Sequence, residues 1–427
     1  VSEHPVLGAR SPYFNDQFVK QWMGVNQFFV KNCHHHELRN KKDSSTTEDE
    51  MKRNWGVLES LIHRLLVEEP FYGVIAELDK LLNVTDPTED HADELMRHIV
   101  EPQHQRYFFD KCNNPKWLPL LEKRGAFSSP LDSIEKDGYI QFVPWSESGY
   151  LSRIAEHADD AVFRIIEKLD TQNLSVLGNF VEAAIKSSPD VAEKYTDLIV
   201  RKKWLKNKYT LRLPDQVSGL MEKLATAGKH EKALALADEL FSVQGTGPVK
   251  ISDDPDSPLR YTYPDAKPFY DEWQFEQIIK NKTSGLSQGK PVEIFGIYVR
   301  KLKEAIELEG KEGDKDNLDN FYEYSHIWRP DITAARSYGR EDVKNILLDE
   351  VINLIQAHAN NLEILKRFTS LLKEQSYALF RRIEMYLYFV SQQNFEAGIE
   401  AILSDERIIH AYNLKREYFQ LLGKTFP

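Results

Sequence analysis

Residues 217–241, VSGLMEKLATAGKHEKALALADELF, decide the fold of this chain. Two amphipathic segments, 217–227 and 231–241, are separated only by Gly228, Lys229 and His230. A connection this short makes the two helices antiparallel neighbours. Small side chains let the two helices approach closely; they are Ala225, Ala227, Ala233, Ala235 and Ala237. The stretch therefore predicts a helical pair, and it is the clearest repeat unit in the sequence.

Segments of the same periodicity lie on both sides of this pair. Apolar residues recur three and four positions apart, the spacing of a helix with one buried face. The predicted helices cover residues 18–29, 55–65, 74–82, 94–100, 151–169, 176–186, 190–200, 341–358, 362–372, 380–390, 395–403 and 414–422. Many short helices with short links predict an all-α fold, an α-solenoid of stacked, degenerate helical pairs between the tetratricopeptide and HEAT types.

Two regions interrupt the helical pattern. An aromatic connector contains a short helix that ends at Gly125 and a brief strand over 139–143, stopped by Pro144. An insertion rich in Pro, Gly and Asp contains one helix over 270–279. The expected organisation is an N-terminal helical region 1–106, connector 107–150, helical repeats 151–242, insertion 243–291 and C-terminal repeats 292–427.

Composition narrows the class of protein. The chain has 427 residues, 41% of them hydrophobic, and a formal net charge of -12. The hydrophobic fraction is typical of a globular protein. The negative net charge disfavours a dedicated nucleic-acid binder. No apolar run approaches the roughly 20 residues that span a bilayer, and there is no signal peptide pattern. With only two cysteines, we expect a cytoplasmic protein without a disulfide framework and without a membrane partner.

Catalytic motifs are missing from the sequence. The nearest approach to a phosphate-binding loop, residues 285–290, is one residue short and lacks the hydroxyl that ligates magnesium. There is no Gly-x-Ser-x-Gly turn for a nucleophilic serine. We therefore expect a protein that is not an enzyme and needs no cofactor.

One group of residues has the spacing of metal ligands. His91, Glu94 and His98 are three and four positions apart, on one helical face, and His104 is a candidate fourth ligand. The favoured interpretation is a solvent-exposed helical face. A metal-dependent hydrolase that uses these residues is the distant alternative.

A basic patch near residue 205 offers a candidate nucleic-acid contact. It comprises Arg201, Lys202, Lys203, Trp204, Lys206, Lys208, Tyr209 and Arg212. Cations interleaved with aromatic rings suit a phosphate backbone and stacked bases. Two other interpretations are open. In the first, the patch is the C-terminus of a helix, whose dipole attracts the cations while Trp204 packs inward. In the second, the patch binds an acidic protein.

Two aromatic and arginine pairs are candidates for a protein contact: Trp328 with Arg329, and Phe380 with Arg381. Such pairs are enriched in the energetic centres of interfaces. Packing within the core is the more common role of these residue types. The four residues are therefore candidates either for a protein contact or for the core.

Several stretches resemble one class of large bacterial proteins. They are YFFDKCNNPKWLPLLEKRGAF (107–127), FVPWSESGYLSRIA (142–155), YSHIWRPDI (324–332), REDVKNILLDEVINLI (340–355) and YALFRRIEMYLYFV (377–390). Their character and order resemble the C-terminal helical region of STAND-type NTPases and related anti-phage defence proteins. The resemblance implies a sensor region, with the effector domain elsewhere. It carries over no functional residue. We expect a scaffold or sensor that binds a protein or another macromolecule.

Overall fold

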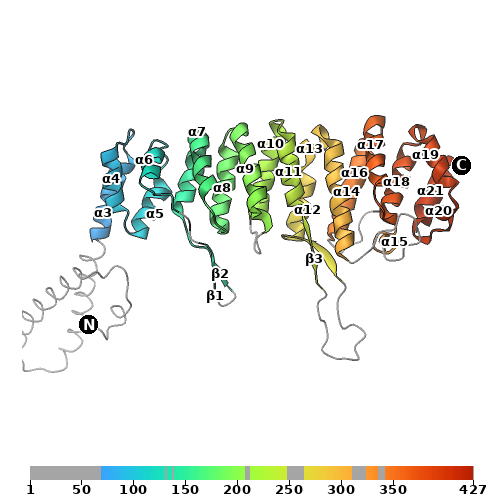
Figure 1. Ribbon diagram of the computed structural model, residues 1–427, viewed down its shortest axis with the longest axis horizontal. Helices are drawn as coiled ribbons and strands as arrows, with labels where there is room; N and C mark the ends of the chain where they lie inside the picture. The colour runs from blue at the N-terminus through green and yellow to red at the C-terminus, as the bar shows by residue number, and fades with distance from the viewer. Residues whose placement is uncertain are drawn as a thin grey trace, which may run out of the picture. The chain divides into compact units, whose positions relative to one another are not determined.

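A computed structural model describes residues 69–128, 130, 132–136, 139–206, 212–247, 264–309, 324–334 and 342–426 (Figure 1). These residues are mostly helical with a few short strands, which confirms the predicted all-α class. The chain divides into two units, one ending at Lys111 and one beginning at Cys112. Within the described ranges, no helix combines the length and apolar character needed to cross a membrane.

The described part of the first unit is a group of three helices. They are α3 (Glu69–Leu82), α4 (Glu89–His98) and α5 (Pro102–Lys111). Leu78, Leu95 and Phe108 are fully buried between them. The Thr88 side chain accepts a hydrogen bond from the backbone N–H of His91, and the His91 ring accepts one from the Thr88 N–H. This reciprocal cap satisfies two backbone groups at the start of α4.

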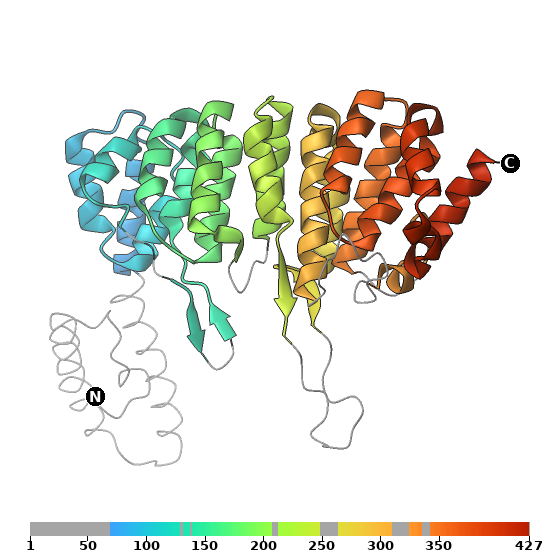
Figure 2. The same ribbon diagram turned by 45° about the vertical axis from the view of Figure 1, so that its right-hand side comes forward.

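The other described helices belong to the second unit. Its α-helices are α6 (Trp117–Lys123), α7 (Ser146–Lys168), α8 (Leu174–Lys186), α9 (Pro189–Lys202), α10 (Leu213–Thr226), α11 (His230–Leu240), α12 (Glu272–Lys282), α13 (Ser284–Gly289), α14 (Pro291–Leu308), α15 (Ser325–Trp328), α16 (Val343–Ala357), α17 (Leu362–Lys373), α18 (Ala378–Val390), α19 (Glu396–Leu403), α20 (Glu406–His410) and α21 (Lys415–Thr425). Short 3₁₀ turns are η2 (Trp204–Lys206), η3 (Gln392–Asn394) and η4 (Tyr412–Leu414). Figure 2 shows the longer helices side by side in a row.

Helices of this unit pack on helices that are close to them in the chain. Contacts run from α7 to α8, from α8 to α10 and from α10 to α11, and the later part continues from α14 through α17 and α18 to α21. The short connections impose this order, because a helix cannot move far from the helix before it. The core is therefore a continuous layer of side chains between successive helices.

The pair 217–241 has the predicted form. Its helices are α10 and α11, and Gly228 lies between them with a φ of 77°, in the left-handed region that glycine adopts without strain. Leu220, Leu224 and Leu236 are fully buried. The helix predicted over 190–200 is found as α9, which begins at Pro189, a residue that suits the first turn of a helix.

Each interruption of the helical pattern contains a two-stranded hairpin. In the connector, β1 (Ile134–Lys136) pairs antiparallel with β2 (Tyr139–Gln141), so that Ile134 faces Gln141. In the insertion, β3 (Val243–Thr246) pairs with β4 (Asp265–Pro268). Figure 1 shows both hairpins extending from the same edge of the second unit. The sequence predicted only the strand that became β2.

Candidate functional site

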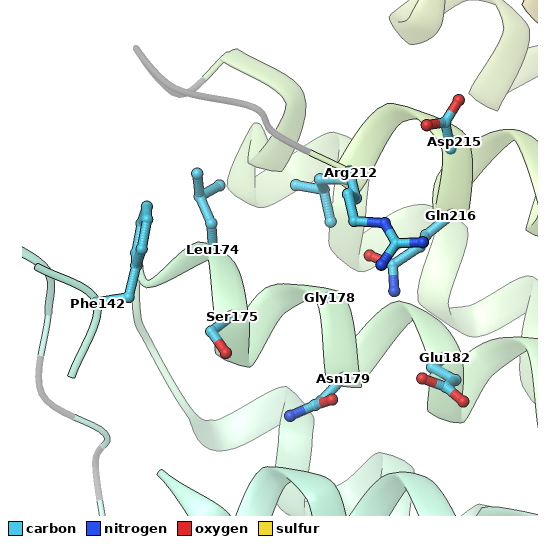
Figure 3. A pocket seen from close by; sticks show the side chains of 10 residues that line it. Phe142, Leu174, Ser175, Gly178, Asn179, Glu182, Arg212, Asp215 and Gln216 are labelled. Atoms are coloured by element: carbon cyan, nitrogen blue, oxygen red, sulfur yellow. The ribbon is translucent and has the colours of Figure 1, made fainter. Parts of the chain in front are cut away.

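A groove opens between α8 and α10 in the second unit (Figure 3). Its volume is about 650 Å³. Residues of α8, residues around the start of α10 and one residue after β2 line it; they are Phe142, Leu174, Ser175, Gly178, Asn179, Glu182, Arg212, Leu213, Asp215 and Gln216. The groove is thus built by helices that are not consecutive in the chain, together with the end of the connector.

The N-terminal cap of α8 brings the connector to the groove. Asn173 accepts a hydrogen bond from the Ser175 N–H at 3.1 Å. Its amide also donates to the carbonyl oxygen of Val143 at 2.7 Å. Because Val143 is tied to the start of α8, the neighbouring Phe142 lies beside Leu174 at one end of the groove (Figure 3).

Polar groups gather at the other end, where most of them already have partners. Asn179 donates to the Ser148 hydroxyl at 2.7 Å. Glu182 pairs with Lys186 at 3.1 Å, and Asp215 accepts a hydrogen bond from the Gln274 amide at 2.7 Å. Arg212 is exposed and makes no ion pair with any residue in the described ranges. Its guanidinium is therefore the charged group of the groove that is most open to an incoming anion.

Gly178 lies on α8 where the Gln216 side chain of α10 comes closest to it. A Cβ atom at this position would lie 2.9 Å from the Gln216 side-chain oxygen, closer than real contacts allow. The glycine therefore lets the Gln216 side chain approach the backbone of α8. Figure 3 shows the Arg212 guanidinium near Gln216, on the side of the groove that faces Asn179 and Glu182.

Three of the six cations in the basic patch predicted from sequence lie near a carboxylate of another segment. Arg201 lies 3.6 Å from Glu167, Lys202 lies 3.8 Å from Asp170, and Lys206 lies 3.9 Å from Glu239. Trp204 is buried against Phe180, with ring centroids 6.1 Å apart. These contacts favour the interpretation in which the cations belong to the C-terminus of α9 and Trp204 packs inward.

The other described residues of the patch, Lys203 and Arg212, have different surroundings. Lys203 is exposed at the end of α9, in a left-handed conformation with a φ of 52°. Lys208 and Tyr209 lie outside the described residues. Arg212 lines the α8–α10 groove. Nucleic-acid binding by the patch stays a prediction.

The aromatic and arginine candidates meet in one region but differ in exposure. Phe380 is 1% exposed and Arg329 is 6% exposed. Arg329 donates to Asp349 at 2.6 Å, and it also binds Asn345. Trp328 and Arg381 are half-buried, and Arg381 pairs with Glu384. Of the four candidates, only Trp328 and Arg381 are partly accessible, while the other two pack inside the chain.

The candidate metal ligands lie on α4 in the first unit. His98 and Glu94 are 4.0 Å apart, whereas the His91 ring is engaged in the cap with Thr88. His104 is buried on α5, and burial lowers the pKa of its imidazole. Across the residues that the structure describes, no group of three or more His, Cys, Asp or Glu side chains is arranged to hold a metal ion.

The sequence pointed to Arg212 but not to the rest of the groove. Phe142, Asn179 and Gln216 belong to three separate segments, and nothing in the local pattern distinguishes them from other exposed or half-buried positions. Comparison of the chain with protein-family models, with curated proteins and with solved structures finds no match.

Proposed function

We propose that this chain is a non-catalytic α-solenoid of degenerate helical pairs that binds an extended segment of a partner protein. The supporting observation is the α8–α10 groove, which has an apolar end and an open arginine at the other end. Rows of helical pairs present long surfaces, which suit peptides and proteins better than small molecules.

The side chains of the groove define the segment that it would accept. Phe142 is half-buried and offers apolar surface to an aliphatic or aromatic side chain, whereas Leu174 and Leu213 also line the groove but are almost fully buried. Arg212 offers a planar, permanently charged donor set to a carboxylate. The amide of Gln216 lies on the same side of the groove (Figure 3) and adds a hydrogen-bond donor. The expected ligand is an extended peptide with an apolar residue followed within a few positions by an acidic one.

A sensor protein must pass the binding of its ligand on to an effector domain. The resemblance of about residues 107–422 to helical regions of STAND-type NTPases suggests an effector domain in the same protein or in a partner, with a role in defence against phage. The ordered contacts from α7 to α21 support this proposal, because a shift of one helix moves its neighbours in a continuous row.

Site-specific photo-crosslinking tests the proposed groove. A photoreactive phenylalanine at Ser175 lies inside the groove, and one at Lys366 on the exposed surface of α17 serves as the control. We expect a discrete protein adduct at Ser175 alone. Arg212→Glu should remove the adduct. Arg367→Glu, a charge reversal at an arginine that is 63% exposed on α17, should leave it.

Two results would contradict the proposal. Equal adducts at Ser175 and Lys366 would show that the groove has no preference for the partner. An adduct that disappears on nuclease treatment and weakens steeply with salt would instead support the nucleic-acid alternative.

A further inference from the structure

The outer face of α21 carries an exposed apolar stripe. Phe419 is 58% exposed and Phe426, one residue beyond the helix, is 69% exposed. Leu422 lies between them and is partly exposed. Spacings of four and three place these residues on one side of the helix. Tyr418 and Leu421, on the adjoining face of the helix, are buried against the rest of the unit. No described residue covers the stripe fully.

A groove runs beside this stripe, between α19 and α21. Its volume is about 690 Å³, and Ile399, Leu403, Leu422 and Phe426 give it an apolar lining. The two helices run in opposite directions along it. The Gln392 amide, before the start of α19, donates to the Thr425 hydroxyl at the end of α21 at 3.3 Å. The Tyr418 hydroxyl donates to the Leu403 carbonyl at the other end, at 3.0 Å.

The rim of the groove is acidic, and the stripe ends in a lysine. Glu396 and Glu400 lie on successive turns of α19, line the groove and are exposed. Neither forms an ion pair with a residue in the described part of the chain. Lys415 lies four residues before Phe419, so it continues the stripe toward the start of α21. The groove therefore favours an apolar helix with a basic residue, and α21 is itself such a helix.

We propose that two copies of this chain associate about a two-fold axis through this face, with the two α21 helices antiparallel. In this arrangement the Phe419–Phe426 stripe of one copy covers the groove of the other. Lys415 of each copy then lies near the far end of the other α21, beside Glu396 and Glu400. The surface is self-complementary in charge, as a two-fold interface requires. It is small, so we expect a dissociation constant on the order of micromolar.

Sedimentation velocity of the full chain tests the proposal. We expect a monomer–dimer equilibrium between about 1 and about 100 µM protein. Phe419→Asp with Phe426→Asp should raise the dissociation constant at least about tenfold, because charges then replace the centre of the interface. Trp273→Asp, at another aromatic residue that is 60% exposed, is the matched control and should leave the equilibrium unchanged. Circular dichroism confirms that each variant is folded.

Charge exchange makes the test specific for the two-fold arrangement. Lys415→Glu alone should weaken the dimer, as should Glu396→Lys with Glu400→Lys. A variant that combines all three substitutions again places opposite charges at residue 415 of one copy and at residues 396 and 400 of the other. It should regain at least part of the lost association. A wild-type chain that is monomeric throughout the range overturns the proposal, as does a dimer that is indifferent to the phenylalanine or charge variants. The Arg212→Glu variant separates this face from the α8–α10 groove, because it should leave dimerisation unchanged.

Discussion

Arg382 on α18 and Glu417 on α21 form a doubly hydrogen-bonded ion pair inside the protein. Arg382 Nη2 lies 2.7 Å from Glu417 Oε1, and Arg382 Nε lies 2.9 Å from Oε2. The two side chains are 1% and 3% exposed. Arg382 Nη2 also donates to the carbonyl oxygen of Arg329 at 2.8 Å. One guanidinium thus joins α18 to α21 and to the segment that follows α15.

Removing one member of this pair should destabilise the second unit strongly. Glu417→Ala leaves the Arg382 charge buried without its counter-ion, which costs about 3–5 kcal/mol of unfolding free energy. The double variant Arg382→Met with Glu417→Leu should lose less than either single charge deletion, because no buried charge remains. Urea unfolding followed by circular dichroism measures both.

The neighbouring Arg416 provides a matched control for that experiment. It pairs with Asp331 at 2.5 Å, but its side chain is 52% exposed. Because water screens exposed pairs, Arg416→Ala should cost less than about 1 kcal/mol. An equal loss in Arg416→Ala and Glu417→Ala would show that burial is not the cause.

Gly398→Ala should lower stability by forcing Tyr388 to move. A Cβ atom at Gly398 would lie 2.8 Å from the Tyr388 hydroxyl oxygen. That hydroxyl donates to Glu384 Oε1 at 2.8 Å, and the ring is buried. We expect a loss of about 1–3 kcal/mol from overpacking. Gly296→Ala, where the nearest atom is an ordinary 3.6 Å away, should be neutral or stabilising in the same unfolding assay, since alanine is the better helix former.

Cys112 should resist thiol reagents while the protein is folded. Its side chain is buried, and burial raises the pKa of the thiol from its ordinary value of 9.0 to about 11. The reactive thiolate is therefore scarce at pH 8. In a Cys33→Ser background, which leaves Cys112 as the single cysteine, Ellman's reagent should label the chain only after denaturant is added. Rapid labelling of the native protein would contradict this placement.

The same shift makes stability depend on pH. A thiol whose folded pKa is above its unfolded value favours folding while it stays protonated, so its contribution is complete below about pH 9 and is lost between pH 9 and pH 11. Cys112→Ala should remove this component. The difference in unfolding free energy between wild type and variant should therefore change between pH 8 and pH 11.

Lys203→Gly should stabilise the end of α9. Lys203 adopts a φ of 52° and a ψ of 44°, a left-handed conformation that is strained for a residue with a Cβ atom. Glycine removes this strain and should raise stability by about 0.5–1 kcal/mol. Lys203→Ala removes the same charge but keeps the Cβ atom, so it should bring no such gain in thermal unfolding.

Local sequence was sufficient for most of the helices. Segment 176–186 became α8 (Leu174–Lys186), and segment 362–372 became α17 (Leu362–Lys373). Each carries an apolar face and follows directly on an asparagine cap, Asn173 or Asn361. The predicted helix over 270–279 is found as α12 (Glu272–Lys282), two to three residues later. The predictions for residues 1–68 lie outside the described residues.

The hairpins were harder to predict than the helices. Strand β2 was visible as an aromatic and β-branched run ended by Pro144, but its partner β1 has no such pattern. Strands β3 and β4 are separated by the residues between Thr246 and Asp265. Pairing over that distance in the chain depends on contacts that no local period records.

The sequence by itself determined the helical class, the antiparallel pair at 217–241 and the two interruptions, because apolar period, caps and glycine or proline act within a few residues. Only the tertiary structure decided which charged residues are buried together and which side chains form a groove. Arg381 and Arg382 are adjacent in the chain, yet the first is half-buried and the second is 1% exposed. Burial depends on the packing of neighbouring helices, so residues far apart in the chain, such as Arg382 and Glu417, acquire their roles only when α18 meets α21.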